Sequence, residues 1–487
     1  MNNKNNGIKI FSGIGWSFAE KIFVQMVSLL ISIILARILS PEDYGILALI
    51  NVFIAIGDAL VISGFGLALV QKKDSNEQDF NSICWLNIGF SLILYILLFI
   101  GAPFIAKFYE NNKLILITRV LGLRLFFLAV NSIQQAYIQK YMIFRKNFII
   151  SMIGAILSGI ISIILAMSGA GVWSLIVQNL SLVIFNTIFL FMVIEWKPVF
   201  ECSQRSIKKM WKYGSRVFFA TIIDALKDNI RSLVIGKVFS SSDLAFYNQG
   251  KRFPQLLVND IVNSIGKVLF PVFSENQGNI EKNKKLMRFS IQISSFILLP
   301  MIFGLIGIAD NFISLFLTEK WIFCVPYLRI LSLVYVTRPI NTILKNSLLS
   351  IGRSDVNLFH EVVTSIVTII LIFIAAISLK NIQMIAWSYV IVSVIGTVIF
   401  SYYVKKEYSY TILQILYDYM PSFILSVVMS FVVFFIGKIQ VNLALRLFFQ
   451  VSIGVSIYIS LAYILNMKEF YYVKKLIERK IFHKEVK

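Results

Sequence analysis

The chain has 487 residues, of which 58% are hydrophobic and 15% are charged, and its formal net charge is +21. So high an apolar fraction excludes an ordinary soluble domain and indicates an integral membrane protein. A nucleic-acid-binding protein would need a folded basic face, and no loop in this sequence is long enough to form one. We therefore attribute the excess of basic residues to membrane topology and to a polar interior.

Apolar stretches of roughly 20–25 residues, long enough to cross a bilayer, recur along the chain and predict about fourteen transmembrane helices. The first six are Ser12–Leu35, Gly45–Val70, Phe80–Pro103, Leu114–Tyr137, Phe148–Met167 and Val172–Ile194. The next six are Gly214–Val238, Leu244–Val272, Leu286–Ile308, Pro326–Ile351, Leu358–Leu379 and Ile382–Val404. Met420–Gly437 and Ala444–Met467 complete the set. The predicted fold class is an all-α integral membrane protein.

Basic residues are concentrated in alternate loops, above all in the link 196–213 and in the tail 468–487. The positive-inside rule assigns these loops to the cytoplasm. With an even number of spans, both termini are then predicted to be cytoplasmic. We interpret the basic tail as a surface anchor on anionic lipid. A partner-binding helix is the alternative.

The chain repeats itself at an offset of 200 residues, because Leu35–Gly45 and Ile235–Ala245 share the order small, basic, apolar, apolar, Ser and Asp. Each repeat contains six spans, so the repeats are expected to run parallel and to enclose a central cavity. The predicted organisation is a lobe at 1–195, a linker at 196–213, a second lobe at 214–405, two appended helices at 406–467 and the tail at 468–487.

A charged stripe runs through the predicted seventh span. Asp224, Lys227, Asp228 and Arg231 are spaced by three and four residues and share one helical face. Each would cost roughly 2.5–3.5 kcal/mol if it faced lipid at the bilayer centre. The stripe is therefore predicted to face protein or water. Intramembrane charges usually mark a transport path; the alternative is a set of ion pairs that locks two helices.

Polar and basic residues at helical spacing on other spans predict further lining of the same cavity. With the stripe, the candidate cavity residues are Lys21, Gln25, Arg124, Asp224, Lys227, Asp228, Arg231, Lys251, Asn259, Lys267, Arg338 and Lys345. A cationic cavity suits a phosphate or carboxylate substrate, because charge-assisted hydrogen bonds are strong where water is scarce. The alternative is polar packing between helices.

Four carboxylates are the candidates for ion coupling by a proton or a sodium ion: Asp58, Asp228, Asp260 and Glu361. Each could instead be a salt-bridge partner. The sequence contains no phosphate-binding glycine loop, so an ion gradient is the expected energy source. No other cofactor is expected, and Cys84, Cys202 and Cys324 form neither a metal motif nor a predicted disulfide.

Several motifs carry a family resemblance that covers nearly the whole chain. Gly13–Leu49, with Trp16 and the run Ala36-Arg37-Ile38-Leu39-Ser40-Pro41-Glu42-Asp43-Tyr44-Gly45, resembles the opening signature of bacterial polysaccharide-transport proteins. Gly169–Leu175, Phe270–Ser274 and Gly352–Asp355 are further matches. These proteins are the Wzx-type flippases of the multidrug/oligosaccharidyl-lipid/polysaccharide exporter superfamily, and the resemblance is greatest to the colanic-acid and teichuronic-acid exporter branch.

The resemblance implies two six-helix lobes and two further helices that form a groove for a lipid tail. It also implies a non-enzymatic flippase in the bacterial cytoplasmic membrane. The implied substrate is an undecaprenyl-diphosphate-linked oligosaccharide, moved to the outer leaflet for surface polysaccharide assembly; membrane lipids and the polysaccharide polymerase machinery are the other expected partners. The alternatives are a cation-coupled drug antiporter of the same superfamily and a membrane polysaccharide polymerase or glycosyltransferase.

Overall fold

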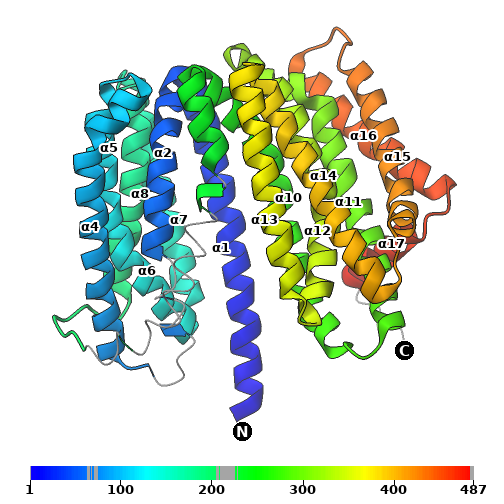
Figure 1. Cartoon of the computed structure of the whole chain (residues 1–487), viewed down its shortest axis with the longest axis horizontal. Coiled ribbons are helices and arrows are strands. Elements are labelled where there is room, and N and C mark those ends of the chain that lie inside the picture. The colour runs from blue at the N-terminus through cyan, green and yellow to red at the C-terminus, as the bar shows by residue number, and fades with distance from the viewer. Residues whose placement is uncertain are drawn as a thin grey trace. The chain divides into compact units, whose positions relative to one another are not determined.

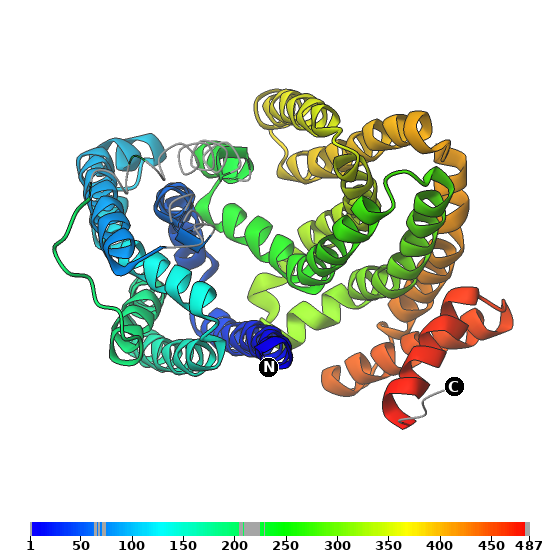
Figure 2. The ribbon, with the colours of Figure 1, turned by 90° about the horizontal axis from the view of Figure 1, so that it is seen from below.

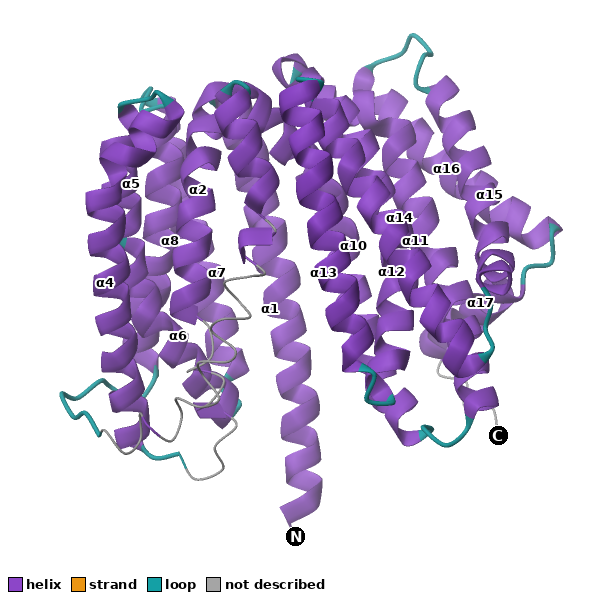
Figure 3. Ribbon diagram, in the orientation of Figure 1, coloured by secondary structure: helices purple, strands orange, loops and turns teal. Residues whose placement is uncertain are grey.

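The computed structural model describes residues 2–62, 66, 69–70, 75–203, 208, 225–227 and 229–482. All regular elements in these ranges are helices (Figure 3). Thirteen helical segments of the described chain are long and apolar enough to cross a membrane. The predicted all-α membrane fold is thereby confirmed. In the predicted seventh span, Gly214–Val238, residues 214–224 and 228 lie outside the described residues.

The chain divides into two compact units, Met1–Ala245 and Phe246–Lys487. The helices of unit 1 are α1 (Asn2–Ile38), α2 (Pro41–Ile62), α4 (Glu77–Tyr109), α5 (Lys113–Gly122), α6 (Arg124–Tyr141), α7 (Phe144–Met167) and α8 (Val172–Val193) (Figure 1). Within this unit, α7 packs against both α1 and α8, and α4 packs against α5 and α6. The helices α1, α6, α7 and α8 enclose the polar pocket described below.

Unit 2 begins within α10 (Ser241–Glu275). It continues with α11 (Ile280–Phe316), the 3₁₀ helix η1 (Glu319–Cys324), α12 (Val325–Ser350), α13 (Ser354–Phe373), the π-helix η2 (Ile374–Ser378), α14 (Ile382–Tyr408), α15 (Ile412–Ile436), α16 (Leu443–Ile464) and α17 (Lys468–Phe482). The long helix α11 packs against α12, α15 and α16. Figure 2 shows α16 and α17 together at the C-terminal edge of this unit.

The starts of α2 and α10 have the same local structure, 200 residues apart. Ser40 Oγ donates to the Asp43 carboxylate at 2.7 Å, and Asp43 N donates back to Ser40 Oγ at 3.2 Å. Ser240 and Asp243 make the same two hydrogen bonds at 2.6 and 3.1 Å. In each pair, the bond from the aspartate amide satisfies a backbone donor at the helix start. The repeat seen in the sequence therefore has a structural counterpart at these two positions.

Several helices are longer than the predicted spans. The helices α4, α10 and α11 contain 33, 35 and 37 residues, whereas hydropathy detects only the apolar part of each. Their polar end turns extend the helices beyond the apolar stretch, because backbone hydrogen bonding continues wherever water or a cap satisfies the end groups.

A glycine brings two helices of unit 1 into close contact. A Cβ atom on Gly159 of α7 would lie 2.1 Å from Cδ1 of Ile31 on α1, so only glycine permits this approach. On the outer faces, large apolar side chains are exposed, including Phe104 at 71% and Met192 at 75%. Such faces are suited to lipid contact.

Candidate functional site

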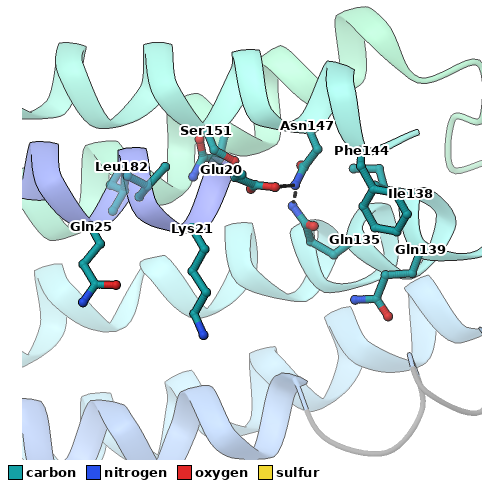
Figure 4. A pocket seen from close by; sticks show the side chains of 12 residues that line it. Glu20, Lys21, Gln25, Gln135, Ile138, Gln139, Phe144, Asn147, Ser151 and Leu182 are labelled. Carbon is teal, nitrogen blue, oxygen red and sulfur yellow. Dashed lines mark hydrogen bonds between the residues drawn. The ribbon is translucent and has the colours of Figure 1, made fainter. Parts of the chain in front are cut away.

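Unit 1 contains a polar pocket of about 480 Å³. Its lining comes from α1, α6, α7 and α8 and comprises Glu20, Lys21, Val24, Gln25, Gln135, Ile138, Gln139, Phe144, Asn147, Ser151, Leu182 and Asn186 (Figure 4). All four of these helices belong to candidate membrane spans. Polar side chains in such segments are costly unless they meet protein, water or a ligand, so this pocket is the first candidate functional site.

One wall of the pocket is a hydrogen-bond network around Glu20. Asn147 Nδ2 donates to the two carboxylate oxygens of Glu20 at 2.7 and 2.9 Å, and Ser151 Oγ donates at 2.8 Å. Gln135 Nε2 donates to Asn147 Oδ1 at 3.0 Å, which fixes the orientation of the Asn147 amide. The charge-assisted bonds from Asn147 and Ser151 hold the carboxylate of α1 against α7, and the bond from Gln135 connects α6 to the same network. This network gives the pocket a fixed wall.

Lys21 and Gln25 lie on successive turns of α1 and line the same pocket. Figure 4 shows Glu20 directed toward Asn147, whereas Lys21 and Gln25 extend to another side of the helix. Lys21 is exposed. The structure therefore brings together two of the predicted cavity residues, with a cation in a position that a ligand can reach.

A second polar group in unit 1 joins Asp58 of α2 to Arg124. Arg124 Nη2 lies 2.9 Å from Asp58 Oδ2, and the two side chains are only 16% and 20% exposed. Arg124 Nη1 also donates to Asn179 Oδ1 at 3.5 Å. Among the described residues, Asp58 Oδ1 and Arg124 Nε are buried without a hydrogen-bond partner. The pair thus keeps one acceptor and one donor for a water molecule or an ion.

Arg124 follows a local tightening of the helix that hydropathy did not predict, although Leu123 itself keeps α-helical dihedral angles. The predicted span Leu114–Tyr137 consists of two helices, α5 and α6, that meet at Leu123. Leu123 N donates to Val120 O at 3.2 Å, a bond over three residues that tightens the turn. Arg124 follows as the first residue of α6, and from there it reaches Asp58.

Among the described residues, the other predicted cavity residues do not belong to the lining of the Glu20 pocket. In the described part of the seventh span, Arg231 is 6% exposed and Lys227 is half-buried, while Asp224 and Asp228 fall outside the described residues. In unit 2, the Lys251 ammonium lies 5.9 Å from the Tyr389 ring centroid, and Arg338 lies 5.7 Å from that of Tyr335. The half-buried residues are Asn259, Asp260, Lys345 and Glu361, and Lys267 is exposed. A common cavity for all of them stays a prediction.

Unit 2 contains a polar network that the sequence did not reveal. The Asp418 side chain on α15 is fully buried and accepts two bonds of 2.7 Å from Arg288 of α11. Gln292 Nε2 and Tyr410 OH each donate to it at 2.8 Å. Burial and the bond to Asp418 raise the pKa of Tyr410 above its ordinary value, so this residue stays a donor. The network fastens α15 to α11.

The described helices and their buried polar groups define a multi-pass α-helical membrane protein with a polar site inside unit 1. Residues 34–326 match the family described as polysaccharide biosynthesis protein. The match covers more than half of the chain, so this protein belongs to the polysaccharide biosynthesis protein family.

Two curated relatives cover nearly the whole chain. The teichuronic acid biosynthesis protein TuaB of Bacillus subtilis (strain 168) is 24% identical over 458 residues, covering 92% of this chain and 93% of the relative. The succinoglycan biosynthesis transport protein ExoT of Rhizobium meliloti (strain 1021) is 25% identical over 460 residues, covering 93% of this chain and 92% of the relative.

Among solved structures, the lipid II flippase MurJ in its inward closed conformation is similar in fold. The TM-score is 0.74 with 16% sequence identity, and the match covers 92% of this chain and 98% of MurJ. At this identity the likeness establishes the fold only. It agrees with the predicted all-α membrane fold.

Proposed function

We propose that this protein is a flippase that moves undecaprenyl-diphosphate-linked oligosaccharide repeat units from the cytoplasmic to the outer leaflet. Its membership of a polysaccharide biosynthesis family supports this, as do the relatives named for teichuronic acid synthesis and succinoglycan transport. The observation that carries the proposal is the polar pocket within the membrane-spanning helices of unit 1.

The chemistry of such a substrate explains why a polar pocket is needed. A sugar-bearing diphosphate cannot enter the hydrocarbon core without losing its hydration, and each unsatisfied polar or charged group there is costly. Lys21 supplies a positive charge for the diphosphate, and Gln25, Gln139 and Asn186 offer amides for sugar hydroxyls. The lipid tail stays in the bilayer, where exposed apolar helix faces accompany it.

Under this proposal transport runs by ion-coupled alternating access, with a proton or a sodium ion as the coupling ion. Asp58 and Arg124 are the leading coupling pair, because a carboxylate oxygen and a guanidinium nitrogen remain without partners among the described residues. The stripe residues Lys227 and Arg231 would extend the polar path. The protein would act in the bacterial cytoplasmic membrane with both termini in the cytoplasm, as a transporter and not as an enzyme.

Deleting the protein tests the proposed function. We expect a lipid-linked oligosaccharide to accumulate on the cytoplasmic leaflet, where an added membrane-impermeant glycosidase or lectin cannot reach it in intact spheroplasts. Wild-type protein supplied in trans should restore surface polysaccharide. Accumulation of single repeat units on the outer leaflet would instead identify a polymerase and would contradict the proposal.

A further inference from the structure

Unit 2 contains a second polar pocket, of about 290 Å³, between α11, α12, α15 and α16. Its polar lining is formed by Asp310, Asn311, Arg329, Lys438 and Gln450. The pocket lies beside the end of α15 at Ile436 and the start of α16 at Leu443, which the predicted topology places at the outer face of the membrane. The proposed function assigns it no role.

The floor of this pocket is a fixed pair of amides. Asn311 Nδ2 donates to Gln450 Oε1 at 2.9 Å and to Gly437 O at 3.2 Å. Gln450 Nε2 donates to Val433 O at 2.9 Å. The two side chains are 9% and 1% exposed, so the appended helices α15 and α16 are joined to α11 by polar contacts that do not depend on bulk water.

Two cations are held beside one aromatic ring at the side of the pocket. The Arg329 guanidinium lies 5.4 Å from the Phe434 ring centroid, and the Lys438 ammonium lies 5.0 Å from the same centroid. Cation–π contacts at these distances favour the observed positions. Both positive charges are thereby held next to the same small volume.

The charges of the pocket do not cancel. Arg329 is paired with Asp310, whose side chain is 48% exposed. Lys438 is exposed, and no carboxylate of the described chain lies within ion-pair distance of it. One positive charge therefore remains. The pocket is predicted to lie at the depth of the lipid headgroups. Lysine, arginine and aromatic side chains are typical of protein surfaces at this depth, and the two cations can bind an anionic headgroup.

We propose that this pocket binds a phosphate group, carried by a lipid headgroup in the outer leaflet. Lys438 contributes the uncompensated charge, Arg329 contributes guanidinium donors, and Phe434 holds both in place. Asp310 competes with the ligand for Arg329, so occupancy is expected to be reversible. This inference does not rest on the proposed function, because any phosphate-bearing lipid of the outer leaflet offers the same group.

Native mass spectrometry of the purified full-length protein in detergent tests the proposal, with dioleoyl phosphatidic acid as the probe and dioleoylglycerol, which has the same acyl chains but no phosphate, as the neutral control lipid. We expect Lys438→Gln to weaken phosphatidic acid binding about tenfold, the effect of losing one charge-assisted contact. Lys438→Arg should retain binding. Asp310→Asn should strengthen it, because the competing carboxylate is removed. Misfolding would weaken binding in either variant, so stronger binding in Asp310→Asn cannot result from misfolding.

Lys380→Gln is the matched control, since Lys380 is an exposed residue of unit 2 at the same predicted face but outside the pocket. Inorganic phosphate added as a competitor separates the two sources of the ligand. Weak competition at millimolar concentration supports a lipid headgroup, whereas complete competition overturns the lipid assignment in favour of free phosphate. Equal binding to wild type, Lys438→Gln and Lys380→Gln would overturn the site itself.

Discussion

The Glu20 pocket of unit 1 and the Asp418 network of unit 2 are both polar groups within membrane helices, but they differ in what they leave open. Asp418 is fully buried and all of its described partners are donors at 2.7 or 2.8 Å. The Glu20 wall stands beside about 480 Å³ of space and an exposed Lys21. A network whose hydrogen-bond acceptors are all occupied leaves no group for a ligand to bind. A pocket with open volume and an exposed cation can bind one.

Pocket volume and cation exposure distinguish a ligand-binding site from a structural network more clearly than the presence of charged residues does. Both regions contain a carboxylate that accepts hydrogen bonds from a neighbouring helix. The remaining volume and the exposure of a cation indicate ligand binding in unit 1. In the described part of unit 2 the Asp418 carboxylate accepts hydrogen bonds from side chains only, which indicates that this network serves to join α15 to α11.

The largest expected effect is on the stability of unit 2. Arg288→Gln leaves the fully buried Asp418 carboxylate without its bidentate partner, at a cost of about 3 kcal/mol, the low end for a buried pair because the Arg288 side chain is itself 40% exposed. The apparent Tm of the protein in detergent should fall by several degrees. Lys285→Gln is the control, because Lys285 is 81% exposed on the same helix and forms only a 3.9 Å pair with Glu281. A wild-type Tm in Arg288→Gln would show that the network is not structural.

The next effect concerns the Asp58–Arg124 pair. Asp58→Asn leaves a guanidinium that is 16% exposed without its carboxylate, at a cost of roughly 2–3 kcal/mol, somewhat below that of a fully buried pair. The double variant with Arg124→Gln should regain most of that stability. If the pair couples transport to an ion gradient, the double variant should still flip slowly and ignore the gradient. Restored gradient dependence would make the pair purely structural.

A smaller effect is expected at the wall of the pocket. Glu20→Gln keeps the size of the side chain but replaces charge-assisted bonds from Asn147 and Ser151 with neutral ones, a loss of about 1 kcal/mol. The variant should show a small decrease in Tm and normal abundance. An Asn147→Leu variant, which also removes the contact to Gln135, should be less stable than Glu20→Gln. The reverse order would contradict the proposed network.

The smallest effect is expected at the C-terminal helix α17. Lys474 and Glu478 are both more than half exposed and form a 3.9 Å pair, the kind of surface ion pair worth less than about 0.5 kcal/mol. Lys474→Gln should therefore leave both the Tm and the level of surface polysaccharide unchanged. A large loss of polysaccharide at normal protein level would give α17 a functional contact.

The sequence predicted the fold well because long apolar runs determine membrane helices almost independently of their partners. Lys21 and Gln25 were also found, since their spacing of four places them on one face of one helix. The irregularity at Leu123 was not predicted, because Gly122 and Arg124 on either side of it interrupt the apolar run too briefly to end a hydropathy window.

What the sequence missed depends on distant contacts. Arg288 lies near the start of the predicted span Leu286–Ile308, and its partner Asp418 lies 130 residues further on. Asp58 and Arg124 were each selected, but their pairing follows from the start of α6 and could not be read from spacing. Asn147 and Ser151 are uncharged and resemble ordinary packing residues of a membrane helix.

The central claim is that the polar pocket of unit 1 carries the diphosphate headgroup across the membrane. The most direct measurement is the flipping rate of a fluorescent undecaprenyl-diphosphate oligosaccharide in proteoliposomes, compared between wild type, Lys21→Gln and the control Lys285→Gln. We predict that Lys21→Gln slows flipping about tenfold, since one charge-assisted contact to the diphosphate is lost, while its Tm and the Lys285→Gln rate remain those of wild type. Equal rates for wild type and Lys21→Gln would contradict the account.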